Sequence, residues 1–174
     1  MLLKIEHLTT QVKNIQTPIL KDVSLEILPQ TITALVGGSG SGKTTLGLSI
    51  LGLLSPALEI VQGTIHFQGS DLLNYSPIEM RRLRGKEIGM IFQEPLYAFN
   101  PVYRIGFQIE EVLKCHTSFK HKDRQEKIHD LLRLVGLNEP KRIINSYSHQ
   151  LSGGMRQRAM IAQAIAAHPK LLIA

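Results

Sequence analysis

The sequence predicts an α/β fold with a mainly parallel sheet and a helical insertion. Short apolar segments typical of strands occur in the first hundred residues and again at the end of the chain, with helical patterns between them. The 174 residues, of which 43% are hydrophobic and 20% charged, fit one globular domain with an ordinary core. This composition excludes disordered and collagen-like proteins.

The first third of the chain shows strand patterns. Residues 22–27 alternate polar and apolar side chains, so the three apolar ones should share one face of a half-buried strand, and residues 2–8 show a weaker version. Residues 31–36 are nearly continuous apolar and β-branched, which is typical of a strand covered on both faces. Further strands are expected at residues 63–69, 88–92 and 171–174.

Helices are expected from capping signals and apolar spacing. Ser76, the proline after it and a glutamate three residues later predict a short helix that ends near Arg84. In residues 124–135, four apolar side chains share one helical face, and Gly136 follows as a stop signal. Other helices are expected at residues 45–54, 105–114 and 155–167.

We expect a cytoplasmic chain without a membrane-spanning or secretory segment. The longest mostly apolar stretch, residues 46–61, is interrupted by polar residues and falls short of the roughly 18 that a spanning helix needs. Residues 1–6 show no basic run before a long apolar stretch. Cys115, the single cysteine, suits a reducing compartment, and we expect it to be a buried or half-buried packing residue.

The net charge of +6 permits binding to phosphate, nucleic acid or an anionic membrane surface. The denser basic stretches, residues 81–86 and 120–124, lack interleaved aromatic residues that stack on unpaired bases, so we interpret them as solvated helix faces. His116 and His121 are five residues apart, but their lysine neighbours also indicate a solvated face rather than a metal site. No nucleic acid partner is expected.

A glycine-rich segment carries the clearest chemical signal. It matches G-x-x-x-x-G-K-[ST] between the expected strand at 31–36 and a helical run, the setting that a phosphate-binding loop requires. Glycines let backbone N–H groups turn toward phosphate oxygens, Lys43 can reach the β- and γ-phosphates, and the Thr44 hydroxyl can bind Mg²⁺. The alternative is a plain glycine-rich turn. The residues expected to bind nucleotide are Gly37, Gly38, Ser39, Gly40, Ser41, Gly42, Lys43, Thr44 and Thr45.

A second motif, residues 151–158 (Leu-Ser-Gly-Gly-Met-Arg-Gln-Arg), resembles the signature sequence of ATP-binding-cassette (ABC) proteins. Ser152, Gly153 and Gly154 at a helix start would form an exposed anion site that a phosphate can approach closely. In that family the phosphate belongs to ATP held by the opposing subunit, so the resemblance implies a head-to-tail dimer. A serine-capped helix start after a flexible turn is the alternative.

Residues 91–93 (Ile-Phe-Gln) resemble the Q-loop of the same family. The resemblance implies that Gln93 is a catalytic and metal-binding residue that contacts Mg²⁺ and the attacking water. It also implies that Gln93 communicates to the membrane subunits whether ATP or ADP is bound. The alternative is a solvated glutamine at the end of a strand. The patterns at 93–96, 99–102 and 147–150 look like the oligopeptide, dipeptide and nickel importer branch. The resemblance covers residues 2–174.

This resemblance implies a P-loop NTPase core with an antiparallel N-terminal β subdomain and a helical subdomain. Residues 1–94 and 155–174 would form the ATP-binding core, and residues 95–154 the helical subdomain with the signature. The implied function is the ATP-binding subunit of a peptide importer, with a nickel importer as the alternative, and the cofactors are ATP and Mg²⁺. The implied partners are a second ATP-binding subunit, two transmembrane permease subunits and, indirectly, an extracytoplasmic substrate-binding protein, which would place the chain peripherally on the cytoplasmic face of the cell membrane.

The sequence departs from the family pattern in several places. Val12 stands near the position of the usual adenine-stacking aromatic residue, Gly38 where many relatives carry an acidic residue, and Ser148 where proline is common. Residues 171–174 look like the hydrophobic strand of the Walker B motif, and the sequence ends before the motif's Asp and Glu and the later switch His. We therefore expect residues 1–174 alone to hydrolyse little ATP, and to aggregate or fold only partly.

Two other functions stay open at this point. A soluble cassette ATPase acting on nucleic acid or ribosomes would suit the positive charge, although residues 93–102 argue against it. A non-catalytic chain would bind nucleotide without turning it over. A GTPase is disfavoured because no N-K-x-D sequence occurs.

Overall fold

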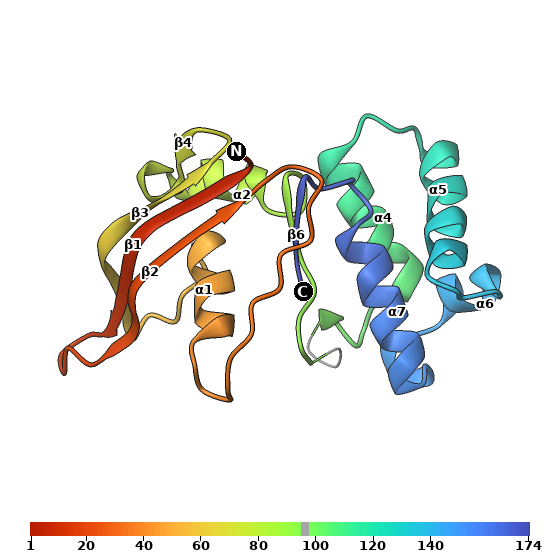
Figure 1. Ribbon diagram of the computed structural model, residues 1–174. Coiled ribbons are helices and arrows are strands. Elements are labelled where there is room, and N and C mark those ends of the chain that lie inside the picture. Colours follow the sequence, from red (N-terminus) through yellow and green to blue (C-terminus); the bar gives the residue numbers. More distant parts are fainter. Residues whose placement is uncertain (95–97) are drawn as a thin grey trace. The chain divides into compact units, whose positions relative to one another are not determined.

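The computed structural model describes residues 1–94 and 98–174 (Figure 1). The chain divides into two compact units, residues 1–81 and 82–174. Within the described residues, no helix is long and apolar enough to cross a membrane.

The first unit is built on an antiparallel sheet. Its strands are β1 (Leu3–Val12), β2 (Pro18–Ile27), β3 (Leu58–Phe67) and β4 (Ser70–Asp71), in the order β2-β1-β3-β4. The expected alternation holds in β2, where Val23, Leu25 and Ile27 are half-buried and their neighbours exposed. Leu3, Ile5 and Leu8 of β1 are almost completely buried, so the central strand supplies much of this unit's core.

The strand predicted at residues 31–36 is not present. These residues were expected to form a strand covered on both faces, but they are irregular, and Ile32 and Val36 are almost fully exposed. A strand needs a hydrogen-bonding neighbour, and none of the strands in residues 1–94 and 98–174 pairs with this segment. The β-branched residues of this segment suit a strand, but pairing within residues 1–94 and 98–174 does not hold them in one.

Three short helical segments accompany the first sheet: α1 (Lys43–Ile50), the 3₁₀ turn η1 (Leu72–Asn74) and α2 (Pro77–Leu83). The last two residues of α2 belong to the second unit. The capping box predicted for α2 is confirmed. The Ser76 backbone N–H and hydroxyl both donate to the Glu79 carboxylate, at 2.8 and 2.6 Å, and the Glu79 N–H donates to the Ser76 hydroxyl at 3.3 Å. These bonds satisfy donors that the first turn of a helix leaves free.

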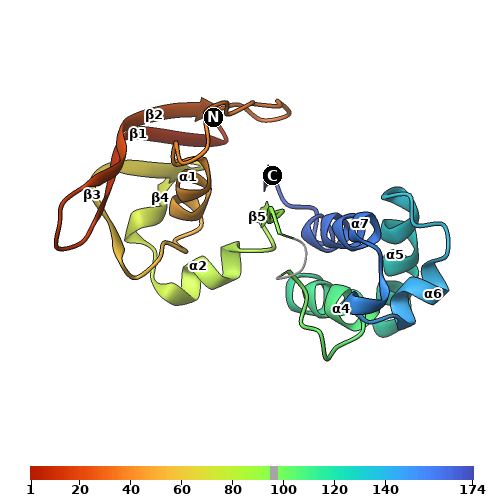
Figure 2. The same ribbon diagram turned by 90° about the horizontal axis from the view of Figure 1, so that it is seen from below.

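The second unit combines two parallel strands with a helical cluster. Strands β5 (Ile88–Met90) and β6 (Leu171–Ile173) pair in parallel, as the predicted α/β class requires. The remaining elements are α4 (Ile105–His116), α5 (His121–Leu134), α6 (Pro140–Asn145), the 3₁₀ turn η2 (Ser148–Gln150) and α7 (Gly153–Ala164). Helices α4, α5 and α7 pack against one another (Figure 2).

The core of the second unit lies among these helices. On α4 the buried residues follow a four-residue spacing, and on α5 three of the four predicted face residues are buried while Val135 is only partly so. Gly136 ends α5 with a φ of 77°, which confirms the predicted stop. The buried residues include Ile105, Ile109, Leu113, Ile128, Leu131, Leu132, Ala159, Met160 and Ala162.

The prediction for Cys115 was also wrong. This cysteine was expected to be buried or half-buried, but it is exposed. The buried stripe of α4 ends at Leu113, and a residue two positions further along a helix points to a different side.

A polar cluster joins α4 to α5. The Glu110 carboxylate accepts hydrogen bonds from the His121 ring at 2.8 Å, from Arg124 Nε at 3.1 Å and from the Gln125 amide at 2.8 Å. Partial burial opposes ionisation of Glu110, but the hydrogen bonds and positive charges of His121 and Arg124 outweigh it and lower the pKa of that carboxyl from 4.5.

Glu110→Gln should therefore destabilise the protein at neutral pH by about 1–2 kcal/mol, because it removes a charged acceptor from three donors. A carboxyl with a lowered folded-state pKa stabilises the fold fully above its unfolded pKa, and this contribution is lost as the pH falls through the folded value. Urea unfolding of both proteins from pH 7 to pH 3 should show a gap that closes below about pH 4.5. A gap that stays constant across this range would contradict the assignment.

Candidate functional site

The predicted phosphate loop lies immediately before α1, in the first unit. Gly42 precedes the helix with a φ of 88°, a left-handed conformation that favours glycine. A Cβ on Gly42 would lie 2.6 Å from Leu20 Cδ2 and 3.2 Å from the Ile19 carbonyl oxygen. Glycine is therefore required here both by the backbone angle and by the close packing of the loop against β2.

The Lys43 ammonium group is held by the loop itself. It donates hydrogen bonds to the carbonyl oxygens of Gly37 and Gly38, both at 2.7 Å, and to the Ser41 hydroxyl at 3.3 Å. The first turn of α1 contains no acidic residue that would neutralise the lysine charge or the positive end of the helix dipole. The loop therefore presents a positive charge beside the N–H groups of a helix start, an arrangement that suits a phosphate chain.

The remaining loop residues leave room for a ligand. Residues 37–41 are exposed, and a Cβ added to Gly38 or Gly40 would meet no atom within 4 Å. The Thr44 side chain, the expected Mg²⁺ ligand, is also exposed, whereas Thr45 is half-buried. A hydroxyl beside a cationic phosphate cradle is chemically suited to Mg²⁺ that is already bound to phosphate oxygens.

Gln93 belongs to the second unit and follows the carboxyl end of β5. The Ile91 N–H donates to the Ile173 carbonyl at 2.8 Å, which extends the β5–β6 pairing to within two residues of Gln93. The Gln93 side chain is exposed at this end of the strand pair, the end at which α/β sheets usually bind ligands. Pro95 and Leu96 of the importer-like pattern lie outside the described residues.

The predicted signature occupies the start of α7, also in the second unit. Ser152 is the N-cap, and its hydroxyl accepts a hydrogen bond from the Met155 N–H at 3.3 Å. Ser152, Gly153 and Gly154 are exposed, and a Cβ on either glycine would meet nothing within 4 Å. The chain's own packing therefore does not require glycine at either position.

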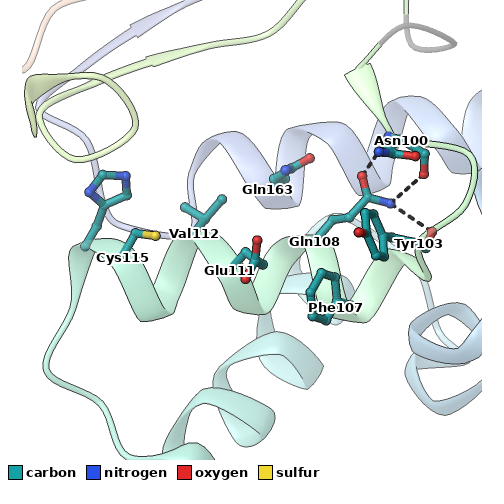
Figure 3. Close-up of a pocket in the computed structure, with 9 residues that line it drawn as sticks. Asn100, Tyr103, Phe107, Gln108, Glu111, Val112, Cys115 and Gln163 are labelled. Carbon is teal, nitrogen blue, oxygen red and sulfur yellow. Dashed lines mark hydrogen bonds between the residues drawn. The ribbon is translucent and has the colours of Figure 1, made fainter. Parts of the chain in front are cut away.

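A groove along α4 was missed by the sequence reasoning. Its volume is about 430 Å³, and Figure 3 shows its lining side chains. The rings of Tyr103 and Phe107 stack with centroids 5.0 Å apart, and nearly half of each side chain is exposed. The signal was present in the sequence, since Phe107, Glu111 and Cys115 recur every four residues on one face of α4 and Tyr103 precedes the helix at the same spacing. The groove is lined by Asn100, Tyr103, Phe107, Gln108, Glu111, Val112, Cys115, His116 and Gln163.

Hydrogen bonds fix one end of this groove. The Gln108 amide donates to the carbonyls of Asn100 and Tyr103 and accepts from the Asn100 N–H (Figure 3). At the other end, partial burial and the charge of Lys86 lower the pKa of His116. The importer-like pattern at 99–102 thus has a structural role, because Phe99 is buried in the helical core and Asn100 ties the loop to α4.

Comparison with known proteins shows the family of the chain. Residues 20–174 match the family described as ABC transporter. The chain belongs to the ABC transporter family. The chain, called the cassette from here on, is 41% identical over 99% of its length to the dipeptide transport ATP-binding protein DppD of Haemophilus influenzae. It is 43% identical, again over 99%, to the oligopeptide transport ATP-binding protein AppD of Bacillus subtilis.

The cassette spans about half the length of these curated relatives, 53% of DppD and 54% of AppD. Among solved structures, it resembles the dimeric bacterial ABC transporter cassette MJ0796 with a TM-score of 0.86 and 26% identity, over 98% of this chain and 72% of that one. The predicted family and α/β fold class are thereby confirmed.

Proposed function

We propose that this cassette is the ATP-binding part of an importer for peptides, and that it uses ATP with Mg²⁺. The observation that carries the proposal is the phosphate loop, where Lys43 and the start of α1 present positive charge beside exposed glycines. The relatives named for dipeptide and oligopeptide transport favour peptides as the cargo. Nickel is the alternative cargo that the sequence patterns left open.

In this proposal the loop residues 37–45 bind the phosphates of ATP. Bound Mg²⁺ would neutralise charge between the β- and γ-phosphates, held by the Thr44 hydroxyl and the Gln93 amide oxygen. Gln93 would also orient the attacking water.

The proposal also includes partners. Ser152, Gly153 and Gly154 would contact the ATP held by a second ATP-binding subunit, consistent with the dimeric cassette MJ0796. Two permease subunits and, through them, an extracytoplasmic binding protein would complete the importer, with this chain on the cytoplasmic face of the membrane. Residues 1–94 and 155–174 would form the ATP-binding core and residues 95–154 the helical subdomain.

We assign the α4 groove to the permease, because an exposed pair of aromatic rings that hydrogen bonds hold in place suits a protein partner.

Lys43→Ala should weaken ATP binding about tenfold to a hundredfold, because it removes a charged donor from the phosphate cradle. Isothermal titration calorimetry on the full-length protein measures this directly. Lys21→Ala is the matched control, since Lys21 is an exposed lysine of β2 outside the loop. Equal affinity of the Lys43 variant and the wild type would show that ATP binds elsewhere.

Gly153→Asp should leave ATP binding to the monomer intact and abolish dimerisation driven by the slowly hydrolysed analogue ATPγS. The new carboxylate finds open space in its own chain but would face a phosphate in the dimer. Sedimentation velocity with and without nucleotide measures the effect, and Gly153→Asn separates charge from size. A Gly153→Asp protein that dimerises like the wild type would exclude the role across the dimer.

Phe107→Ala should lower co-purification with the membrane subunits about tenfold while leaving ATP affinity unchanged, because it removes half of the aromatic pair. Phe119→Ala is the control, since Phe119 has similar exposure and does not line the groove. Quantitative pull-down of detergent-solubilised complexes provides the measurement. Equal losses for the two variants would remove the groove from the interface.

A further inference from the structure

The first turn of α7 is less buried than the turns that follow it. From Ser152 to Arg158 every residue is exposed or half-exposed, and full burial begins only at Ala159. Met155 packs against the helical core as a partly buried residue. The segment with Ser152, Gly153 and Gly154 is itself exposed, and it lies between buried Leu151 and buried Ala159.

Arg158 supplies a long-range contact at the end of this half. Its Nη1 donates a hydrogen bond of 2.7 Å to the carbonyl oxygen of Val135, the C-cap residue of α5. The last carbonyls of a helix have no partner within the helix and carry the negative end of its dipole, so they attract a cation. This contact joins α7 to α5 across 23 residues of sequence.

Gly136 makes room for this contact. It lies directly after Val135 with a φ of 77°, and a Cβ added to it would clash with Arg158 Nη1. The clash is with the far end of a flexible side chain, so a methyl group there would displace the guanidinium rather than the backbone. Glycine at this position thus serves both the end of α5 and the docking of Arg158.

We propose that Arg158 is a positioning residue for the signature. By fixing the second turn of α7 on the end of α5, it sets the direction in which Ser152, Gly153 and Gly154 face. In this role Arg158 acts through the orientation of α7 and not through a contact of its own with the nucleotide. This inference rests on the proposed function, in which those three residues contact the ATP of a second subunit.

Arg158→Ala in the full-length protein tests the inference. The Kd of dimerisation in ATPγS should rise about tenfold, since one charged hydrogen bond is lost, while the affinity of the monomer for ATPγS stays within about twofold. Arg158→Lys should restore most of the dimerisation, because the lysine ammonium can donate to the same carbonyl. Sedimentation velocity and calorimetry on the same preparations give both constants, with thermal unfolding as a check of the fold.

Gly136→Ala provides an independent route, because it displaces the guanidinium without changing Arg158. Gly69→Ala is the matched control, since Gly69 also has a positive φ, 85°, but a Cβ there would meet nothing within 4 Å. Gly136→Ala should weaken dimerisation like Arg158→Ala, and the double variant should be no worse than either single one. Gly69→Ala should dimerise normally.

Other outcomes would overturn the inference. If Arg158→Ala dimerises like the wild type while Gly153→Asp does not, Arg158 has no positioning role and the proposed function stands. If neither variant affects dimerisation, the proposed function fails and this inference with it. If Arg158→Ala lowers the unfolding temperature and weakens monomer binding and dimerisation together, with no rescue by lysine, the role of Arg158 is purely structural.

Discussion

Three hydrogen bonds hold the ammonium group of Lys43 against the carbonyls of Gly37 and Gly38 and the hydroxyl of Ser41. They require the loop backbone to curl around the lysine. That curl in turn requires a residue at position 42 that accepts a φ of 88° and packs against Leu20. A phosphate chain bound here would replace loop carbonyls as partners of the amine. Nucleotide binding, metal binding and dimerisation in our account all depend on this loop.

Glycine serves opposite purposes at different places in this chain. At Gly42 and Gly136 an added Cβ would collide with the chain itself, so the small residue is needed for packing and for the backbone angle. At Gly153 and Gly154 an added Cβ would meet nothing. Glycine there gains nothing within the chain, which is the physical basis for assigning these positions to an external phosphate.

Local patterns predicted well those features that are determined locally. The glycine turn before α1, the capping box at Ser76 and the buried face of α5 each depend on residues a few positions apart. The strand expected at 31–36 was wrong because pairing depends on a neighbour that local pattern does not supply. The Arg158–Val135 bond was not predicted, because it depends on how α5 and α7 pack together. The exposure of Cys115 and the groove beside Gln108 were also not predicted, although the four-residue spacing along α4 carried a signal for both.

Hydrogen–deuterium exchange of the full-length protein, with and without Mg²⁺ and ATPγS, tests the central claim most directly. Nucleotide contacts on the backbone should slow exchange of the N–H groups of residues 38–45 by about tenfold or more at every protein concentration. The N–H groups of residues 153–155 should become protected only at concentrations where the dimer forms. Bound nucleotide that leaves the exchange of residues 38–45 unchanged would contradict the account.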